Sequence, residues 1–335
     1  MRVLLLRRQS FGGIATHTGQ LAEGLRERGV EVEIEEADWI PDRTGGKFDK
    51  NVSERLRKVA KGCDLVHAFG YRAAWACSAA FGSDEAWLYS AWDMPKTTHP
   101  ILIGKLNDCT AGLCSSRAVY GALDEAIAIH LQVVKPGVTP QEIPRPREEL
   151  RRELGLDETS LAVGAMGRYV PERGFDALIE AMNDVWPAFE EAHLLLAGKG
   201  PAEDDLKAIA MGARKPERIR FFGSVSDPLA FLGALDLLVV PSRRAGTSMV
   251  ALEGMSLGVP VLLRHTGGLP ELIDEDISGM TFNTDASLAS RINEMLGLPL
   301  TLETLARAAR VRVEEHFRLD DTVDRIERIY RSIGS

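Results

Sequence analysis

The stretch PSRRAGTSMVALEGMSLGVPVLLRHTGG, residues 241–268, decides how the fold of this chain is interpreted. Its pattern indicates the end of a buried strand, a loop, one helix, a second strand and a turn with paired glycines. The helix is expected to begin near Thr247 and Ser248, because hydroxyl side chains favour a helix start. Backbone N–H groups there lack partners within the helix and attract anions such as phosphate. The stretch therefore predicts an anion site, with Glu253 on the same helix.

Length and composition set the broad class of the protein. A chain of 335 residues is too long for one typical core, so two domains are expected. Its formal charge of -9 argues against a dedicated nucleic-acid binder. The four cysteines lack C-x-x-C spacing and are interpreted as free thiols of a reducing cytoplasm. No apolar run approaches the roughly 20 residues of a membrane span, which predicts a cytoplasmic protein; peripheral membrane contact stays open.

Short apolar runs alternate with helical patterns along most of the chain. This alternation predicts α/β domains with mostly parallel, doubly wound sheets. The expected strands are Val3–Leu6, Val30–Ile34, Leu65–Ala68, Ala86–Tyr89, Ala111–Cys114, Leu131–Val134, Leu161–Met166, His193–Ala197, Arg218–Phe222, Leu235–Val240 and Val259–Leu263.

The pattern pauses in a segment that has the composition of a linker. Between Lys135 and Leu156, four prolines precede a charged helix start. The predicted division is residues 1–138, residues 139–318 and a closing amphipathic helix in 319–335 that packs back on the N-terminal domain. Two Rossmann-like domains of this kind place their ligand in a cleft between them, near the carboxyl ends of the strands.

Two arginines follow the strand that ends at Met166. In GRYVPERGF, residues 167–175, Arg168 and Arg173 lie five residues apart on a strand-to-helix loop. Guanidinium groups offer fixed pairs of donors that suit a diphosphate. At this point, two solvated surface arginines explain the pattern as well as a diphosphate clamp does.

Two weaker signals also have a plain alternative. Gly12-Gly13 lets a backbone approach a ligand at a helix start, but an ordinary tight turn has the same letters. The G-x-G-x-x-G spacing of a nicotinamide fingerprint is absent. A carboxylate such as Glu253 can accept hydrogen bonds from the two hydroxyls of a ribose, and it can equally be a glutamate on a helix surface.

Taken in order, several segments resemble a known family. They are GRYVPERGFDALIEAM, LLLAGKGP, FFGSV, DLLVVPS, VALEGMSLGVPV and GGLPELI, between residues 167 and 273. In sequence and order they are similar to the family-4 retaining glycosyltransferases of the GT-B fold. GGIATHTGQLAEGLRERGVEV (12–32) resembles the family's opening, and VVKPGVT (133–139) resembles its interdomain linker. The resemblance spans nearly the whole chain and is more specific in the C-terminal half.

The resemblance implies a nucleoside-diphosphate sugar donor, held mainly by the C-terminal domain, with the N-terminal domain on the acceptor side. Arg168 and Arg173 would hold the diphosphate, with Arg173 standing where a lysine is usual. The other implied donor contacts are the backbone of Thr247, Ser248 and Met249 to the sugar and phosphates, Glu253 to the ribose, the backbone of Val225 to the base, and Gly13 to the diphosphate from the other domain.

This sequence departs from the family's pattern at two positions. Ala245 stands where a glutamate usually contacts the donor sugar, and alanine cannot accept a hydrogen bond through its side chain. Trp92 stands where a histidine near the reacting carbon is expected. If the alignment shifts by one residue there, Asp93 is a polar candidate for the catalytic position. His17 and His67 are interpreted as packing or local hydrogen-bonding residues.

The implied activity is transfer of a hexose-type sugar, with retention, to a hydroxyl of a sugar, lipid-linked or small-molecule acceptor. No cofactor or metal is required, because arginines and N–H groups can neutralise the leaving diphosphate. The D-x-D letters of Asp274-Glu275-Asp276 are interpreted as a surface loop. Two alternatives stay open: a nucleotide-sugar-binding relative that has lost transfer, which Ala245 and Trp92 favour, and a GT-B sugar-nucleotide epimerase.

Overall fold

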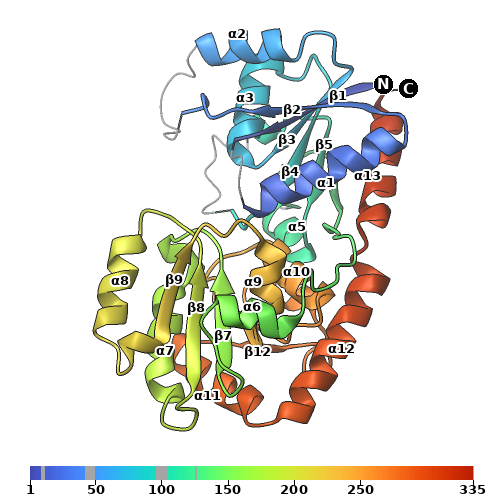
Figure 1. The fold of residues 1–335 in the computed structure, drawn as a ribbon. Helices are drawn as coiled ribbons and strands as arrows, with labels where there is room; N and C mark the ends of the chain where they lie inside the picture. Colours follow the sequence, from blue (N-terminus) through green and yellow to red (C-terminus); the bar gives the residue numbers. More distant parts are fainter. Residues whose placement is uncertain (9–11, 42–49, 96–103, 125–126, 335) are drawn as a thin grey trace. The chain divides into compact units, whose positions relative to one another are not determined.

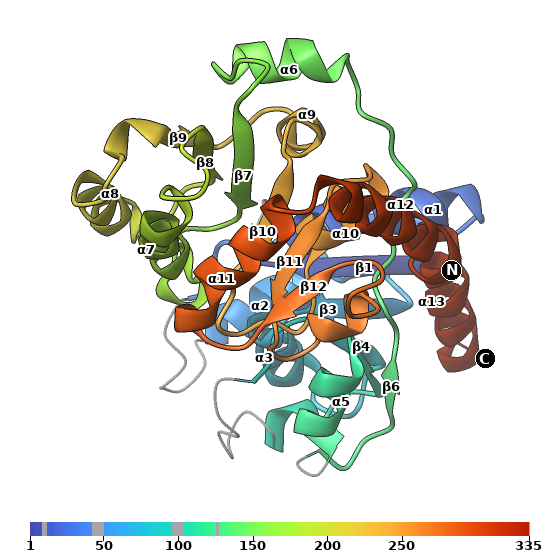
Figure 2. The same ribbon diagram turned by 90° about the horizontal axis from the view of Figure 1, so that it is seen from below.

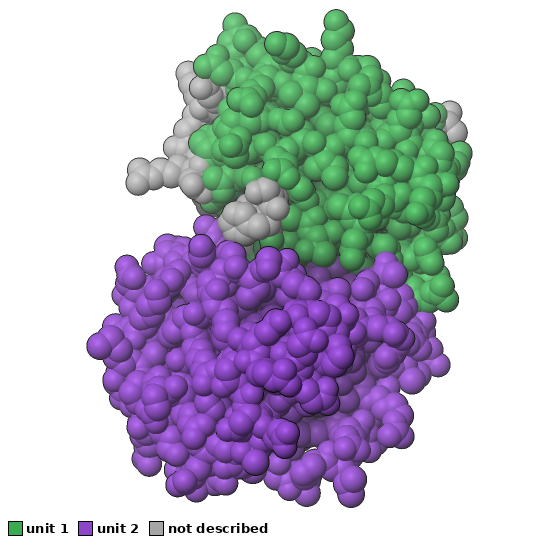
Figure 3. Space-filling model, in the orientation of Figure 1, with its two compact units in different colours: residues 1–137, 317–335 green, residues 138–316 purple. Residues whose placement is uncertain are grey.

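A computed structural model describes residues 1–8, 12–41, 50–95, 104–124 and 127–334 of the chain. The chain forms two compact α/β units (Figure 3). Unit 1 consists of Met1–Gly137 and Phe317–Ser335, and unit 2 of Val138–His316. Within the described residues, none of the helices combines the length and the apolar composition that crossing a membrane requires.

Unit 1 contains a six-stranded parallel sheet with the order β2-β1-β3-β4-β5-β6 (Figure 1). The order reverses between β1 and β3, so the loops that follow these two strands lie at a topological switch point. The strands are β1 (Arg2–Arg7), β2 (Glu31–Glu36), β3 (Leu65–Phe69), β4 (Trp87–Ala91), β5 (Ala111–Cys114) and β6 (Leu131–Val133). The helices include α1 (Gly13–Glu27), α2 (Lys50–Val59), α3 (Tyr71–Phe81), α5 (Arg117–Asp124) and α13 (Leu319–Ile333).

The last helix, α13, packs against α1 within unit 1. A Cβ atom added at Gly24 would lie 2.8 Å from Val323 Cγ2, so glycine permits the two helices to approach closely. Arg28 Nε donates a 2.8 Å hydrogen bond to Asp324 Oδ1. The Tyr330 hydroxyl and His67 Nδ1, which lies on β3, are 2.6 Å apart. These contacts explain why the C-terminal residues return to the first unit.

Unit 2 contains a second six-stranded parallel sheet, with the order β12-β11-β10-β7-β8-β9. The strands are β7 (Leu161–Met166), β8 (Ala192–Ala197), β9 (Ile219–Gly223), β10 (Leu237–Val240), β11 (Val261–Arg264) and β12 (Met280–Phe282). Helices lie on both faces of this sheet (Figure 1, Figure 2). They are α6 (Arg147–Glu153), α7 (Phe175–Val185), α8 (Glu203–Met211), α9 (Pro228–Gly233), α10 (Met249–Ser256), α11 (Asp285–Leu296) and α12 (Pro299–His316).

The predicted fold class, two Rossmann-like doubly wound α/β domains, is confirmed. Central strands such as β8 are buried along their whole length, which is why they appear in the sequence as unbroken apolar runs. Each expected strand agrees with the structure to within two residues at either end. The three-residue strand β12 was not predicted, whereas α6 lies at the charged helix start that was expected after the four prolines.

Candidate functional site

The sheet of unit 2 reverses its strand order between β7 and β10, and the loops after these strands pack against each other. Gly174 ends the β7 loop with a φ of 70°, and a Cβ atom there would lie 2.2 Å from the Pro241 carbonyl oxygen. Arg243 N donates to the Glu172 carbonyl oxygen at 2.9 Å. Ligands of doubly wound sheets bind outside such a switch point. Both loops carry residues that the sequence analysis singled out.

The arginines of these loops differ in what they bind. Arg243 forms a bidentate pair with Asp176, at 2.9 and 2.8 Å, and a further ion pair with Asp285 at 3.0 Å. Its guanidinium is therefore occupied in joining the β10 loop to α7 and α11. Arg168 is exposed, and its side chain has no hydrogen-bond or ion-pair partner among the described residues. Arg173 donates only a long hydrogen bond, 3.5 Å, to Ser242 Oγ.

Arg168 and Arg173 thus form no ion pair with a carboxylate in the described part of the chain. Arg173 reaches across the switch point from the β7 loop to the β10 loop through Ser242. The sequence analysis did not single out Ser242, because a lone serine after a strand carries no charge and no spacing signal. Two free guanidinium groups at one switch point are an anion-binding arrangement.

Helix α10 begins in the same place. Ser248 is its N-cap, and Ser248 Oγ accepts a 3.2 Å hydrogen bond from Ala251 N. The N–H groups of Met249 and Val250, in the first turn, have no acceptor within the helix. Thr247, just before the cap, is buried, and its Oγ1 has no hydrogen-bond partner in the described part of the chain. The start of α10 therefore offers donors to an anion from the side of the β10 loop.

Glu253 lies on α10, and its carboxylate has no ion-pair or hydrogen-bond partner among the described residues. Burial raises the pKa of this carboxyl from 4.5 to about 7, since the charged form is poorly solvated there. Helix α10 packs against α9, and the turn before α9 carries Val225. Asp227 caps α9 by accepting from Ala230 N at 3.0 Å.

We expect the substitution Glu253→Gln to stabilise the protein at about pH 8 and to change little at about pH 4. Between pH 4.5 and about 7 the unfolded chain releases this proton while the folded protein retains it. Stability therefore falls as the pH rises through that window, by up to about 3 kcal/mol. Melting temperatures at both pH values measure the effect. Glu180→Gln, at an exposed glutamate of α7, is the control; a Glu253→Gln variant that gains nothing at pH 8 contradicts the raised pKa.

The predicted donor-binding residues fall into four places. Arg168, Arg173, Thr247 and Ser248 lie in the paired loops at the switch point of unit 2, and Met249 follows them as the first residue of α10. Val225 lies further along the same edge, after β9, and Glu253 is one turn into α10. Gly13 is the first residue of α1 and belongs to unit 1.

The weaker candidates also lie in unit 1, around the end of β4. Trp92 is buried, and its ring lies 4.6 Å from that of His17, measured between ring centroids. Asp93 is exposed. His67 is fully buried and bonds through both ring nitrogens, to the Tyr330 hydroxyl and, at 2.7 Å, to the Ser90 hydroxyl. His67 is accordingly a structural residue of this unit.

The D-x-D sequence Asp274-Glu275-Asp276 lies in the exposed segment between β11 and β12, as predicted for a surface loop. Each carboxylate forms an ion pair with an arginine. Asp274 pairs with Arg312, while Glu275 and Asp276 pair with Arg291 at 3.1 and 3.8 Å. Each of the three carboxylates therefore already has an arginine partner within the protein.

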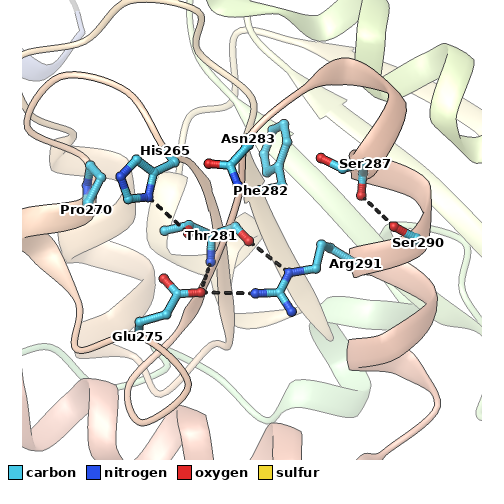
Figure 4. Close-up of a pocket in the computed structure, with 9 residues that line it drawn as sticks. All are labelled: His265, Pro270, Glu275, Thr281, Phe282, Asn283, Ser287, Ser290 and Arg291. Atoms are coloured by element: carbon cyan, nitrogen blue, oxygen red, sulfur yellow. Dashed lines mark hydrogen bonds and ion pairs between the residues drawn. The ribbon is translucent and has the colours of Figure 1, made fainter.

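A pocket of about 480 Å³ lies beside this segment, where β11 and β12 end against α11 (Figure 4). Glu275 accepts from Thr281 N at 2.9 Å and pairs with Arg291, whose Nε donates to the Thr281 carbonyl oxygen. Ser290 Oγ donates to the Ser287 carbonyl oxygen. The pocket contains none of the predicted donor-binding residues. The sequence analysis missed it, because its residues are scattered between positions 265 and 291 without a motif.

Comparison with known proteins identifies what unit 2 is similar to. Residues 146–312 match the family described as glycosyl transferases group 1. A GDP-mannose-dependent monoacylated alpha-(1-6)-phosphatidylinositol monomannoside mannosyltransferase of Corynebacterium glutamicum is 28% identical over 199 residues, 56% of this chain and 52% of the relative. The alpha-D-kanosaminyltransferase of Streptomyces kanamyceticus is 28% identical over 193 residues, 56% of this chain and 50% of the relative. The aligned part of the chain spans about half the length of these relatives.

Solved structures resemble the whole chain in fold. Anabaena Alr3699/HepE in complex with UDP-glucose has a TM-score of 0.85 at 21% identity, covering 99% of this chain and 100% of that protein. WaaG, described as a glycosyltransferase involved in lipopolysaccharide biosynthesis, has a TM-score of 0.78 at 17% identity, covering 98% and 99%. Residues 146–312 thus match the glycosyl transferases of group 1, and the chain has the fold of the solved glycosyltransferase structures that it resembles.

Proposed function

We propose that this protein transfers a hexose-type sugar from a nucleoside-diphosphate sugar to an acceptor hydroxyl, with retention at the anomeric carbon. The observation that carries the proposal is the pair Arg168 and Arg173, which have no carboxylate partner among the described residues and belong to the β7 loop, which packs against the loop that leads into α10. A diphosphate bound there would meet two guanidinium groups and the free N–H groups of a helix start.

The comparisons support the class of donor. The mannosyltransferase relative is named as GDP-mannose-dependent, and the HepE structure with the same fold contains UDP-glucose. In the proposed arrangement unit 2 binds the donor and unit 1 binds the acceptor. The ribose hydroxyls would donate to Glu253, and the base would lie against the backbone of Val225. The acceptor is a hydroxyl of a sugar, a lipid-linked molecule or a small molecule, and a lipid-linked acceptor would bring this protein to a membrane surface.

The proposed chemistry needs stabilisation of the leaving group above all. As the bond from the sugar to the diphosphate breaks, negative charge grows on the β-phosphate. Arg168, Arg173 and the N–H groups of α10 would stabilise that charge more in the transition state than in the bound donor. The acceptor hydroxyl would attack from the face that the diphosphate leaves, with a phosphate oxygen taking its proton. In this scheme the arginines do the work that a metal ion does in other sugar-nucleotide sites.

A nucleotide-sugar-binding protein without transfer activity is the second candidate. Two observations favour it: Ala245 is fully buried and apolar, and the Trp92 ring packs on His17. Ala245 has no polar side-chain atom, and Trp92 can donate through its indole N–H but cannot accept a hydrogen bond as a histidine can.

Transfer and hydrolysis of a panel of nucleotide sugars, UDP-glucose and GDP-mannose among them, separate the two candidates. The proposal predicts release of the nucleoside diphosphate, faster with a suitable hydroxyl acceptor, and a product that retains the anomeric configuration of the donor. Saturable binding of a donor with no turnover for any acceptor would instead establish the binding protein.

A further inference from the structure

Thr247 has an anomalous hydroxyl. The residue is 8% exposed, and its Oγ1 is buried without a hydrogen-bond partner among the residues that the structure describes. Buried hydroxyl groups in native proteins nearly always have a partner, because an unpaired one loses its hydrogen bonds to water without compensation. This hydroxyl therefore calls for an explanation that the folded protein alone does not supply.

The neighbouring residues leave Thr247 as the uncommitted polar side chain of this segment. In 245–248, all of them described, Ala245 and Gly246 have no polar side-chain atom, and the Ser248 hydroxyl caps α10. The Ala245 carbonyl accepts from Gly268 N at 3.1 Å, which ties this segment to the turn after β11. A ligand held at the start of α10 would thus find one free side-chain hydroxyl just before the helix.

We infer that the Thr247 hydroxyl binds a hydroxyl of the donor sugar, and so supplies the polar contact that Ala245 cannot. The inference rests on the proposed function, since it presupposes a nucleoside-diphosphate sugar at the switch point. A rotation about χ1 that brings Oγ1 to a bound sugar breaks no hydrogen bond to the described residues, because none is present.

The sugar suits this hydroxyl better than the phosphates do. A threonine hydroxyl both donates and accepts, as a sugar hydroxyl does, whereas phosphate oxygens of the bound diphosphate only accept. The phosphates already have Arg168, Arg173 and the N–H groups of the first turn of α10. Thr247 precedes that turn, at the end of the segment that begins with Ala245.

The isosteric substitution Thr247→Val tests the inference, with Thr247→Ser as the matched control that keeps the hydroxyl. Dissociation constants are measured by calorimetry for UDP, UDP-glucose, GDP and GDP-mannose. The comparison uses UDP with UDP-glucose or GDP with GDP-mannose, whichever two compounds the unmodified protein binds. Thr247→Val is expected to weaken binding of the nucleotide sugar about ten-fold. It should change binding of the nucleoside diphosphate by less than about two-fold, and Thr247→Ser should keep both affinities within that margin. The melting temperature of unliganded Thr247→Val should equal or exceed that of the unmodified protein.

Three results would overturn the inference. The first is unchanged binding of the nucleotide sugar by Thr247→Val. The second is an equal loss of affinity for the nucleotide sugar and for the nucleoside diphosphate alone, which would assign the hydroxyl to a phosphate. The third is a clear fall in the melting temperature of Thr247→Val, which would make the hydroxyl a structural group. Failure of the proposed function looks different, because the unmodified protein would then bind none of the four compounds saturably.

Discussion

Replacing Arg168 and Arg173 together by alanine is expected to weaken binding of a nucleoside diphosphate at least about a hundred-fold. Each guanidinium would make charge-assisted hydrogen bonds to the phosphates, worth about 1.5–3 kcal/mol apiece, and every 1.4 kcal/mol is ten-fold in affinity. Neither arginine has an ion-pair partner in the described part of the chain, so their removal leaves no buried carboxylate unpaired. The protein should therefore fold and melt as before.

Calorimetric titration with UDP and with GDP measures this effect. Arg214→Ala removes an exposed arginine after α8, far along the chain from both loops, and controls for the loss of one surface charge. The single variants should each lose part of the affinity. If the dissociation constant of the double variant stays within about three-fold of that of the unmodified protein, the change in binding free energy is less than about 1 kcal/mol. The two arginines would then not be part of the binding site.

Gly174→Ala is expected to destabilise the protein strongly. A Cβ atom there would lie 2.2 Å from the Pro241 carbonyl oxygen, and the φ of 70° is unfavourable for alanine. Either the β7 loop or the β10 loop must move. We expect a loss of about 2–4 kcal/mol in the free energy of unfolding, together with weaker nucleotide binding, because Arg173 and Ser242 lie on the two loops that separate.

Gly258→Ala is a matched control for that substitution. Gly258 has almost the same φ, 71°, but nothing lies within 4 Å of an added Cβ atom. Gly258→Ala therefore introduces the backbone strain of a positive φ without a steric collision. This strain alone costs about 1 kcal/mol. Melting temperatures of both variants, with and without nucleotide, measure the difference. An equal fall in both variants would show that the two loops are not held together at Gly174.

The fold could be predicted from the sequence because parallel strands buried on both faces leave unbroken apolar runs. Leu161–Met166 and Ala111–Cys114 were predicted with the bounds that the structure gives them. Strand β12 was missed because three residues, Met280–Phe282, are too short a run to stand out. The start of α6 was expected because a run of charged residues follows the prolines of that segment.

The candidate site could be predicted only in part. The spacing of Arg168 and Arg173 after a strand pointed to an anion site, yet Arg243 stands after a strand as well. Only the folded chain brings Asp176 and Asp285 to Arg243 and leaves the other two without a carboxylate. Such pairings join residues 42 and 67 positions apart and leave no local pattern. The unpaired Thr247 hydroxyl is equally invisible in the sequence, because its burial depends on the packing of the loop.

A crystal structure of the protein with UDP or GDP bound tests the central claim most directly. The account predicts the diphosphate at the switch point of unit 2, within hydrogen-bond distance of the Arg168 and Arg173 guanidinium groups and of the first N–H groups of α10. It also predicts the ribose hydroxyls at Glu253. A nucleotide in the pocket between β11, β12 and α11, or one whose phosphates touch neither arginine, would contradict the account.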